Sequence, residues 1–251
     1  MKRFLWFIFP IIVLIVLWEF VSHSGFVNPS LFPPPSKVSV AFWEMIISGT
    51  LFSDLRDSLW RLFAGLFIGS AFGVVFGLLT GRIKSFATAL SPIIQILRPL
   101  PPVAIIPLVI VWFGIDDGAK IFSIAFAVFF PVWINAHIGA RQIPQAFLWG
   151  AKLFTNSSAK ILREVVFPAA LPFVIAGIRV GIASAFIMVF VAELSGASSG
   201  IGYRISITYL SYRIDEMIAG LLVLGALGAI TDQLFVFGTR KIFPWIKFSS
   251  K

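Results

Sequence analysis

Cysteine is absent from this chain of 251 residues, and histidine occurs only twice, at His23 and His137. The lack of cysteine excludes disulfide frameworks, thiol catalysis and cysteine-ligated metals. Two histidines leave little for a histidine metal site, so we expect no metal centre in this chain. Charge is scarce as well: charged residues make up 12% of the sequence, about half the share in a typical water-soluble domain.

Long apolar runs take the place of the missing charge. Hydrophobic residues make up 59% of the sequence, and apolar stretches of about 20 residues recur, which is the length needed to cross a hydrocarbon core. We therefore predict an all-α, polytopic integral membrane protein with about six transmembrane helices. The expected spans cover residues 4–22, 58–80, 86–114, 119–140, 166–193 and 216–239.

The first expected span has a competing interpretation as a cleaved signal peptide. Its apolar stretch is long for a signal peptide and no A-x-A cleavage site follows it, so we interpret it as an inserted helix. Residues 23–57 then combine the proline-rich connector "NPSLFPPPSK" with a short helix that is apolar on one face, and such a helix is expected to lie at the membrane interface.

The net charge of +9 has two interpretations. It is compatible with binding of an anion or a nucleic acid, but cytoplasmic loops of membrane proteins also collect lysine and arginine. With six spans and a cytoplasmic N-terminus, most of the basic residues fall on the inner side. We therefore predict that both termini are cytoplasmic, and we expect no nucleic-acid partner.

Glycine recurs at every fourth position of the second expected span. On a helix this spacing produces a smooth stripe against which another helix can pack closely, although glycine is also common in membrane helices generally. We predict a helix-packing seam formed by Gly65, Gly69, Gly73, Gly77 and Gly81.

Motifs for nucleotide chemistry and for catalysis are missing. The phosphate-binding pattern G-x-x-x-x-G-K-[ST] does not occur, and there is no paired-carboxylate or serine–histidine constellation. We therefore expect no enzymatic activity, no catalytic residue and no cofactor in this chain.

The loop after the fourth expected span, residues 142–165, resembles a soluble amphipathic helix. The stretch "PQAFLWGAKLF" places Phe147, Gly150, Ala151 and Phe154 at helical spacing. Such a face needs a covering surface. From the residues alone, that surface is either a partner protein or the lipid headgroups.

Ionisable residues within apolar spans suggest function by default. Arg98 precedes the interrupting sequence "PLPP", and Glu193 ends the fifth expected span. Arg98 has two interpretations: it lines a translocation path and meets an oxyanion, or it pairs with a carboxylate such as Glu193. Arg179 and Asp232 also lie within or near spans, and a structural role is favoured for Glu193 and Asp232.

Five stretches together resemble the membrane-spanning permease subunit of type I ABC importers, in the branch that serves sulfonates, taurine, nitrate and bicarbonate. They occur in the family's order and at its spacing over nearly the whole chain: "SLWRLFAGLFIGSAFGVVFGLLTG" (58–81), "ILRPLPPVAIIPLVIVWFGIDDGAKIF" (96–122), "FFPVWINAHIGAR" (129–141), "VFPAALPFVIAGIRVG" (166–181) and "VAELSGASSGIGY" (191–203).

The resemblance implies one transmembrane permease domain over residues 1–251, with the MetI-like fold. Within it, residues 1–57 hold the first span and the connector, 58–239 the core helices, 143–160 a cytoplasmic coupling helix and 240–251 a cytoplasmic tail. The family's coupling signature reads E-A-A, three residues, then glycine. Here these positions fall on Trp149, Gly150, Ala151 and Thr155, so only the second alanine matches. The resemblance implies contact with an ATPase by Phe147, Trp149, Gly150, Ala151, Lys152, Phe154, Thr155, Asn156 and Ser157.

The resemblance further implies a homodimer in the bacterial inner membrane. Its partners would be two ABC ATPase subunits, which bind ATP and Mg²⁺, a periplasmic or lipid-anchored binding protein, and membrane lipid. The transported substrate would be a small oxyanion. The alternative function is a self-sufficient secondary transporter or channel for a small anion, which predicts inverted internal repeats and a coupling-ion site.

Overall fold

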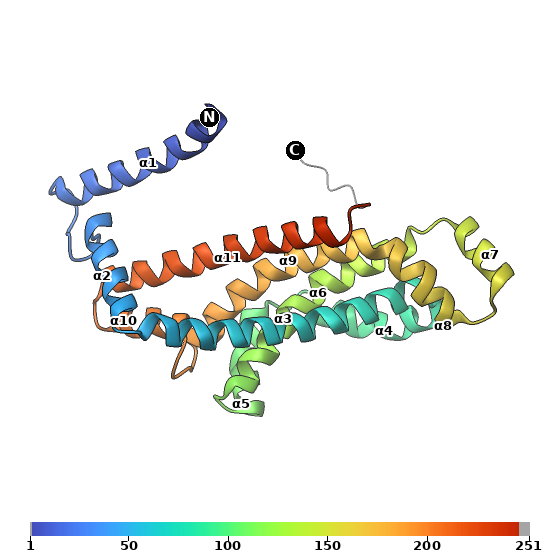
Figure 1. Ribbon diagram of the computed structural model, residues 1–251. Coiled ribbons are helices and arrows are strands. Elements are labelled where there is room, and N and C mark those ends of the chain that lie inside the picture. The colour runs from blue at the N-terminus through green and yellow to red at the C-terminus, as the bar shows by residue number, and fades with distance from the viewer. Residues whose placement is uncertain (1, 246–251) are drawn as a thin grey trace. The chain divides into compact units, whose positions relative to one another are not determined.

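The computed structural model describes residues 2–245, and the side chains of residues 9–245, and this part of the chain forms helices and no strand. Figure 1 follows the elements along the chain. They are α1 (Lys2–His23), α2 (Pro35–Ile47), α3 (Thr50–Arg82), α4 (Lys84–Leu97), η1 (Pro102–Ile105), α5 (Ile106–Phe113), α6 (Asp117–Arg141), α7 (Gln145–Phe154), α8 (Ser158–Ile161), η2 (Leu162–Val166), α9 (Phe167–Leu194), α10 (Ile201–Leu210) and α11 (Ile214–Ile242).

Within the described residues, four helical segments are long and apolar enough to cross a membrane, and a bent pair makes a fifth. The four segments are Thr50–Arg82, Asp117–Arg141, Ser158–Leu194 and Ile214–Ile242. The prediction of an all-α, multi-pass membrane protein is confirmed. The remaining expected span, residues 4–22, falls in α1 (Lys2–His23), and the part of α1 with described side chains, Phe9–His23, is apolar.

The bent pair corresponds to the expected span at residues 86–114. Its two halves, Lys84–Leu97 and Pro102–Phe113, meet at 85°. The cause lies in "RPLPP", because each proline lacks a backbone N–H and restricts the residue before it. The interruption that is visible in the sequence is therefore a sharp turn between two short helices.

The described chain divides into two compact units, which are considered separately. One unit comprises residues up to Ser58 together with Ser198–Ala226, and the other comprises Leu59–Ala197 together with the residues from Leu227 onward. Residues 246–251 of the expected cytoplasmic tail lie outside the described residues.

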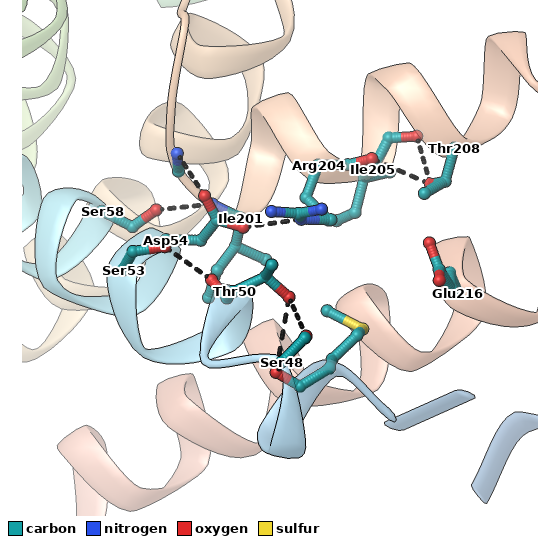
Figure 2. A network of polar contacts seen from close by, with 12 residues as sticks. Ser48, Thr50, Ser53, Asp54, Ser58, Ile201, Arg204, Ile205, Thr208 and Glu216 are labelled. Carbon is teal, nitrogen blue, oxygen red and sulfur yellow. Dashed lines mark hydrogen bonds and ion pairs between the residues drawn. The ribbon is translucent and has the colours of Figure 1, made fainter. Parts of the chain in front are cut away.

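In the first unit, the start of α3 holds the N-terminus of α10 (Figure 2). Asp54 accepts hydrogen bonds from the Gly200 amide at 3.1 Å and from Arg204 Nε at 2.7 Å. Ser58 Oγ accepts from the Ile201 amide at 2.9 Å. The φ angle of +111° at Gly200 is accessible to glycine and disfavoured for other residues. The polar loop before α10 is therefore ordered by side chains of α3.

In the second unit, the fourth-position glycines of α3 face α6. A Cβ atom added at Gly69 would lie 2.5 Å from the Ala125 carbonyl oxygen, and one at Gly77 would lie 2.5 Å from Ala136 Cβ. The other three glycines of the series, Gly65, Gly73 and Gly81, would also meet atoms of α6 at less than 3.0 Å. Without side chains on α3, the two backbones approach closely.

We expect Gly69→Ala to destabilise the protein. Alanine is normally the better helix former by about 1 kcal/mol, but here its methyl group would meet backbone of α6, and such overpacking costs roughly 1–3 kcal/mol. The matched control is Gly238→Ala in α11, where an added Cβ meets nothing within 4 Å in the described structure. The measurement is the thermal unfolding midpoint in detergent. Equal midpoints for the two variants would contradict the predicted packing constraint.

Candidate functional site

Helix α7 exposes most of its apolar side chains. The exposed fraction is 65% for Phe147 and 90% for Phe154, and Trp149 and Leu153 are exposed as well. Positions i, i+3, i+4 and i+7 share one helix face, so Phe147, Gly150, Ala151 and Phe154 lie together. In the described chain a Cβ at Gly150 would meet nothing within 4 Å. This face, called here the α7 face, is thus open to close approach by another molecule.

One side chain of α7 is buried. Leu148 belongs to an apolar cluster with Leu78, Ala140, Ile143 and Val166. The helix begins after Pro144 and ends at Thr155, whose backbone is extended. In Figure 1, α7 lies at one end of α3 and α6, close to the C-terminal end of α6. A short exposed helix is thereby anchored on its neighbours through Leu148.

The remaining predicted coupling residues surround the end of α7. Lys152 and Asn156 are exposed. Thr155 Oγ1 accepts a hydrogen bond from the Ser157 amide at 3.2 Å, and Ser157 Oγ accepts one from the Lys160 amide at 3.3 Å. Ser157 therefore caps α8. Leu153 is a further exposed residue that was not predicted from the sequence, although its position four residues after Trp149 places it on the same side of the helix.

A π-helical segment links α8 to α9. Residues Leu162–Val166 form this segment, and Pro168 lies in the first turn of α9. Val166 belongs to the same cluster as Leu148. The connection from α7 to α9 therefore consists of one packed cluster and one irregular helical turn. Such π-helical turns often occur at functional sites.

A cavity of about 610 Å³ lies among α3, α4 and α6 in the second unit. Arg98, at the C-terminal end of α4, lines it. So do two basic residues of α6, His137 and Arg141, which were not predicted as site residues from the sequence. Their spacing of four residues on one helix was the available signal. The remaining lining residues are Thr80, Ala87, Ser91, Ile94, Gln95, Pro99 and Trp133.

Thr80 organises one wall of this cavity. Its hydroxyl donates to the Phe76 carbonyl at 2.7 Å, and Trp133 Nε1 donates to Thr80 Oγ1 at 3.1 Å. His137 Nδ1 lies 3.0 Å from the same oxygen. Because the Thr80 hydrogen is used by the carbonyl, Nδ1 is the donor in this contact. The ring of His137 is therefore held in one orientation.

Glu193 pairs with Arg61, which corrects the suggested pairing of Arg98 with Glu193. Arg61 Nη1 donates to Glu193 Oε1 at 2.8 Å, and Arg61 Nε donates to Asp117 Oδ1 at 2.7 Å. Both Arg61 and Glu193 are buried. Since the partner of Glu193 comes from the start of α3, the pair ties α3, α6 and α9 together, while Arg98 lies at a separate cavity.

A second ion pair joins α9 to α11. Arg179 donates to both oxygens of Asp232 at 2.7 Å, a bidentate arrangement that fits the planar guanidinium. The side chains remain 52% and 28% exposed. Two charged groups of apolar helices are therefore paired with each other but still accessible in the isolated chain.

Among the described residues, no group of three or more histidine, aspartate or glutamate side chains could hold a metal ion. The chemistry of the basic cavity is instead that of charged and neutral hydrogen-bond donors, which suits an anion.

Comparisons with known proteins agree with this geometry. The family model described as "Binding-protein-dependent transport system inner membrane component" matches residues 69–243. The putative aliphatic sulfonates transport permease protein SsuC of Bacillus subtilis is 34% identical over 93% of this chain and 84% of its own length. The taurine transport system permease protein TauC of Escherichia coli is 30% identical, over 93% and 86%. The nitrate import permease protein NrtB of Synechocystis is 30% identical, over 93% and 87%.

Solved structures share the fold. An inward-facing structure of the MetNI methionine ABC transporter matches with a TM-score of 0.64 at 19% identity, covering 80% of this chain and 98% of that chain. An amino acid ABC transporter matches with a TM-score of 0.59 at 17% identity, covering 82% and 98%. The resemblance inferred from the residues is confirmed, and the chain belongs to the family of binding-protein-dependent transport system inner membrane components.

Proposed function

We propose that this chain forms the translocation path of an ATP-driven importer for a small oxyanion. The preferred substrates are an alkanesulfonate or taurine, followed by nitrate or bicarbonate. The names of the relatives support this choice, because they specify sulfonates, taurine and nitrate. The substrate would reach the outer face on a periplasmic or lipid-anchored binding protein, and the chain would lie in the bacterial inner membrane with both termini in the cytoplasm.

The observation that carries the proposal is the exposed α7 face. Phe147 and Phe154 are exposed on a ten-residue helix whose only buried side chain is Leu148, as far as the described residues extend. Large aromatic side chains that fill a partner's groove often dominate binding energy, and Gly150 lets a groove wall approach the backbone. We infer that an ABC ATPase subunit covers this face, one for each copy of the chain. ATP and Mg²⁺ would bind to that partner, and this chain would carry neither a cofactor nor a catalytic residue.

The packing around α7 would allow a docked ATPase to move α9. Motion of α7 would be passed through the Leu148 cluster to Val166, at the end of the π-helical segment, and then into α9. Packed elements transmit such displacements as rigid bodies. Closure of two ATPases on ATP would thereby tilt the helices that line the path.

The accessible ion pair between Arg179 and Asp232 supports assembly with a second copy. Ionisable groups within transmembrane segments almost always face a bundle interior or a watery cavity, because hydrocarbon does not solvate them. Arg179 and Asp232 lie in two of the candidate spans. We infer that a second copy of the chain covers this surface and that the path runs between the two copies.

Phe147→Gln combined with Phe154→Gln should prevent copurification of the ATPase with a tagged permease. Loss of buried aromatic anchors typically weakens an interface by about 2 kcal/mol or more. Trp149→Gln tests the other side of α7 and should weaken copurification less. Trp245→Gln is the matched control, since Trp245 and Trp149 are 67% and 66% exposed. Full copurification by the double variant would refute docking through the α7 face. ATP-independent transport by the wild-type chain would favour the secondary-transporter alternative.

Arg179→Gln should lower the thermal midpoint and the dimer fraction of the assembled protein. Removing one partner of a covered ion pair costs about 3–5 kcal/mol, against about 0–1 kcal/mol for an exposed pair. Lys37→Gln is the control, because the pair of Lys37 with Asp215 is 58% and 22% exposed, close to the values for Arg179 and Asp232. Mass photometry and thermal unfolding supply the measurements. If the two variants behave alike, the second copy does not cover Arg179.

A further inference from the structure

Among its described lining residues, the basic cavity among α3, α4 and α6 contains arginines but no acidic residue. Arg61 and Arg179 each contact a carboxylate. In contrast, the guanidinium groups of Arg98 and Arg141 have no hydrogen-bond or ion-pair partner within residues 9–245, and no aspartate or glutamate is among the described residues that line this cavity. Two exposed positive charges without a carboxylate partner in the described residues therefore border one open cavity.

Neutral polar side chains complete the lining. Gln95 Nε2 donates to Ser91 Oγ at 2.7 Å, which leaves the Ser91 hydroxyl hydrogen for another acceptor. Thr80 fixes His137 through Nδ1, as described above, and the second ring nitrogen has no partner in the described part of the chain. As hydrogen-bond donors the cavity thus offers two guanidinium groups and one hydroxyl, whereas Nε2 of a neutral His137 ring is an acceptor.

The position of Arg98 accounts for the presence of this space. Arg98 ends α4, and the next helical turn begins only at Pro102, so the chain between them is non-helical. Irregular backbone at membrane depth is tolerated where it is buried in protein or lines a water-filled cavity. The volume of about 610 Å³ exceeds that of a small anion, so a bound anion would keep part of its water.

We propose that this cavity is a binding site for an oxyanion group, held chiefly by Arg98 and Arg141. Planar guanidinium groups bind oxyanions through paired N–H donors, and the Ser91 hydroxyl is available for a remaining oxygen. The assignment of this oxyanion to the transported sulfonate or nitrate rests on the proposed function. Arg141 is the last residue of α6, next to the loop that carries α7, so the site would hold the anion near the cytoplasmic end of its route. An anionic lipid headgroup carries the same chemistry.

The test measures binding of [³⁵S]taurine and of isotopically labelled nitrate to the purified, nucleotide-free permease–ATPase assembly. Arg98→Gln and Arg141→Gln should each weaken binding by about ten- to hundredfold, the usual range for loss of a charge-assisted hydrogen bond. Arg240→Gln is the matched control, because Arg240 is exposed at the end of α11 and does not line the cavity. It should bind like the wild type.

Native mass spectrometry separates the two sources of the oxyanion. If a lipid headgroup occupies the cavity, the wild type retains phosphatidylglycerol in preference to phosphatidylcholine, Arg98→Gln and Arg141→Gln abolish this preference, and taurine and nitrate binding does not change. That result keeps the oxyanion site but rejects the transported anion as its occupant. The proposal is overturned if both variants match Arg240→Gln in lipid retention and in anion binding.

Failure of the proposed function has a different signature. In that case the wild type itself would show no ATPase copurification and no ATP-driven uptake of either anion into proteoliposomes that contain the binding protein. Normal uptake by the wild type and by all the arginine variants would instead reject only the transported anion as the occupant of the cavity.

Discussion

Charged side chains within long apolar helices need a neighbour of opposite charge or access to water, because hydrocarbon solvates neither sign. Arg61 meets this requirement through Glu193 and Asp117, and Arg179 meets it through Asp232. The first pair is buried and joins three helices. The second remains accessible in the isolated chain, and this difference in exposure is the basis for expecting a covering subunit at α9 and α11.

Arg98 and Arg141 are subject to the same requirement but must meet it without an ion pair. Their charges have no carboxylate partner in the described residues, so their environment must supply water or an anion. A cavity built at a break between two helices provides that environment. The same requirement thus accounts for the ion pairs and for the proposed anion site at the cavity.

Close packing connects these charged places to α7. The glycines of α3 bring its backbone against α6, and α6 continues to Arg141 beside the cavity and then to the loop before α7. Leu148 fixes α7 to this same group of helices. An ATPase that moves α7 would therefore act on the helices that carry the cavity, which gives a route from nucleotide chemistry on one protein to access for an anion in another.

Features that depend on local sequence were predictable from the sequence. The helical class, the interruption at "RPLPP" and the exposed helix near residues 145–154 follow from hydrophobic length, from the missing N–H of proline and from helical periodicity. Family membership was predictable from the order of five stretches. Of the two interpretations of Arg98, the pairing with Glu193 is wrong, because the partner of Glu193 is Arg61, 132 residues away, and a single sequence carries no information on which distant charges meet.

The residues that line the cavity were likewise only partly predictable from the sequence. Arg98 was predicted as a candidate site residue because it precedes a proline-rich break. His137 and Arg141 were not, because they resemble ordinary residues near the cytoplasmic end of a span. By itself, the sequence determined that this protein spans a membrane and where its chain must bend, since both depend on neighbouring residues. Only the tertiary structure decided which charges neutralise one another and which remain uncompensated, because that depends on how separate helices pack in space.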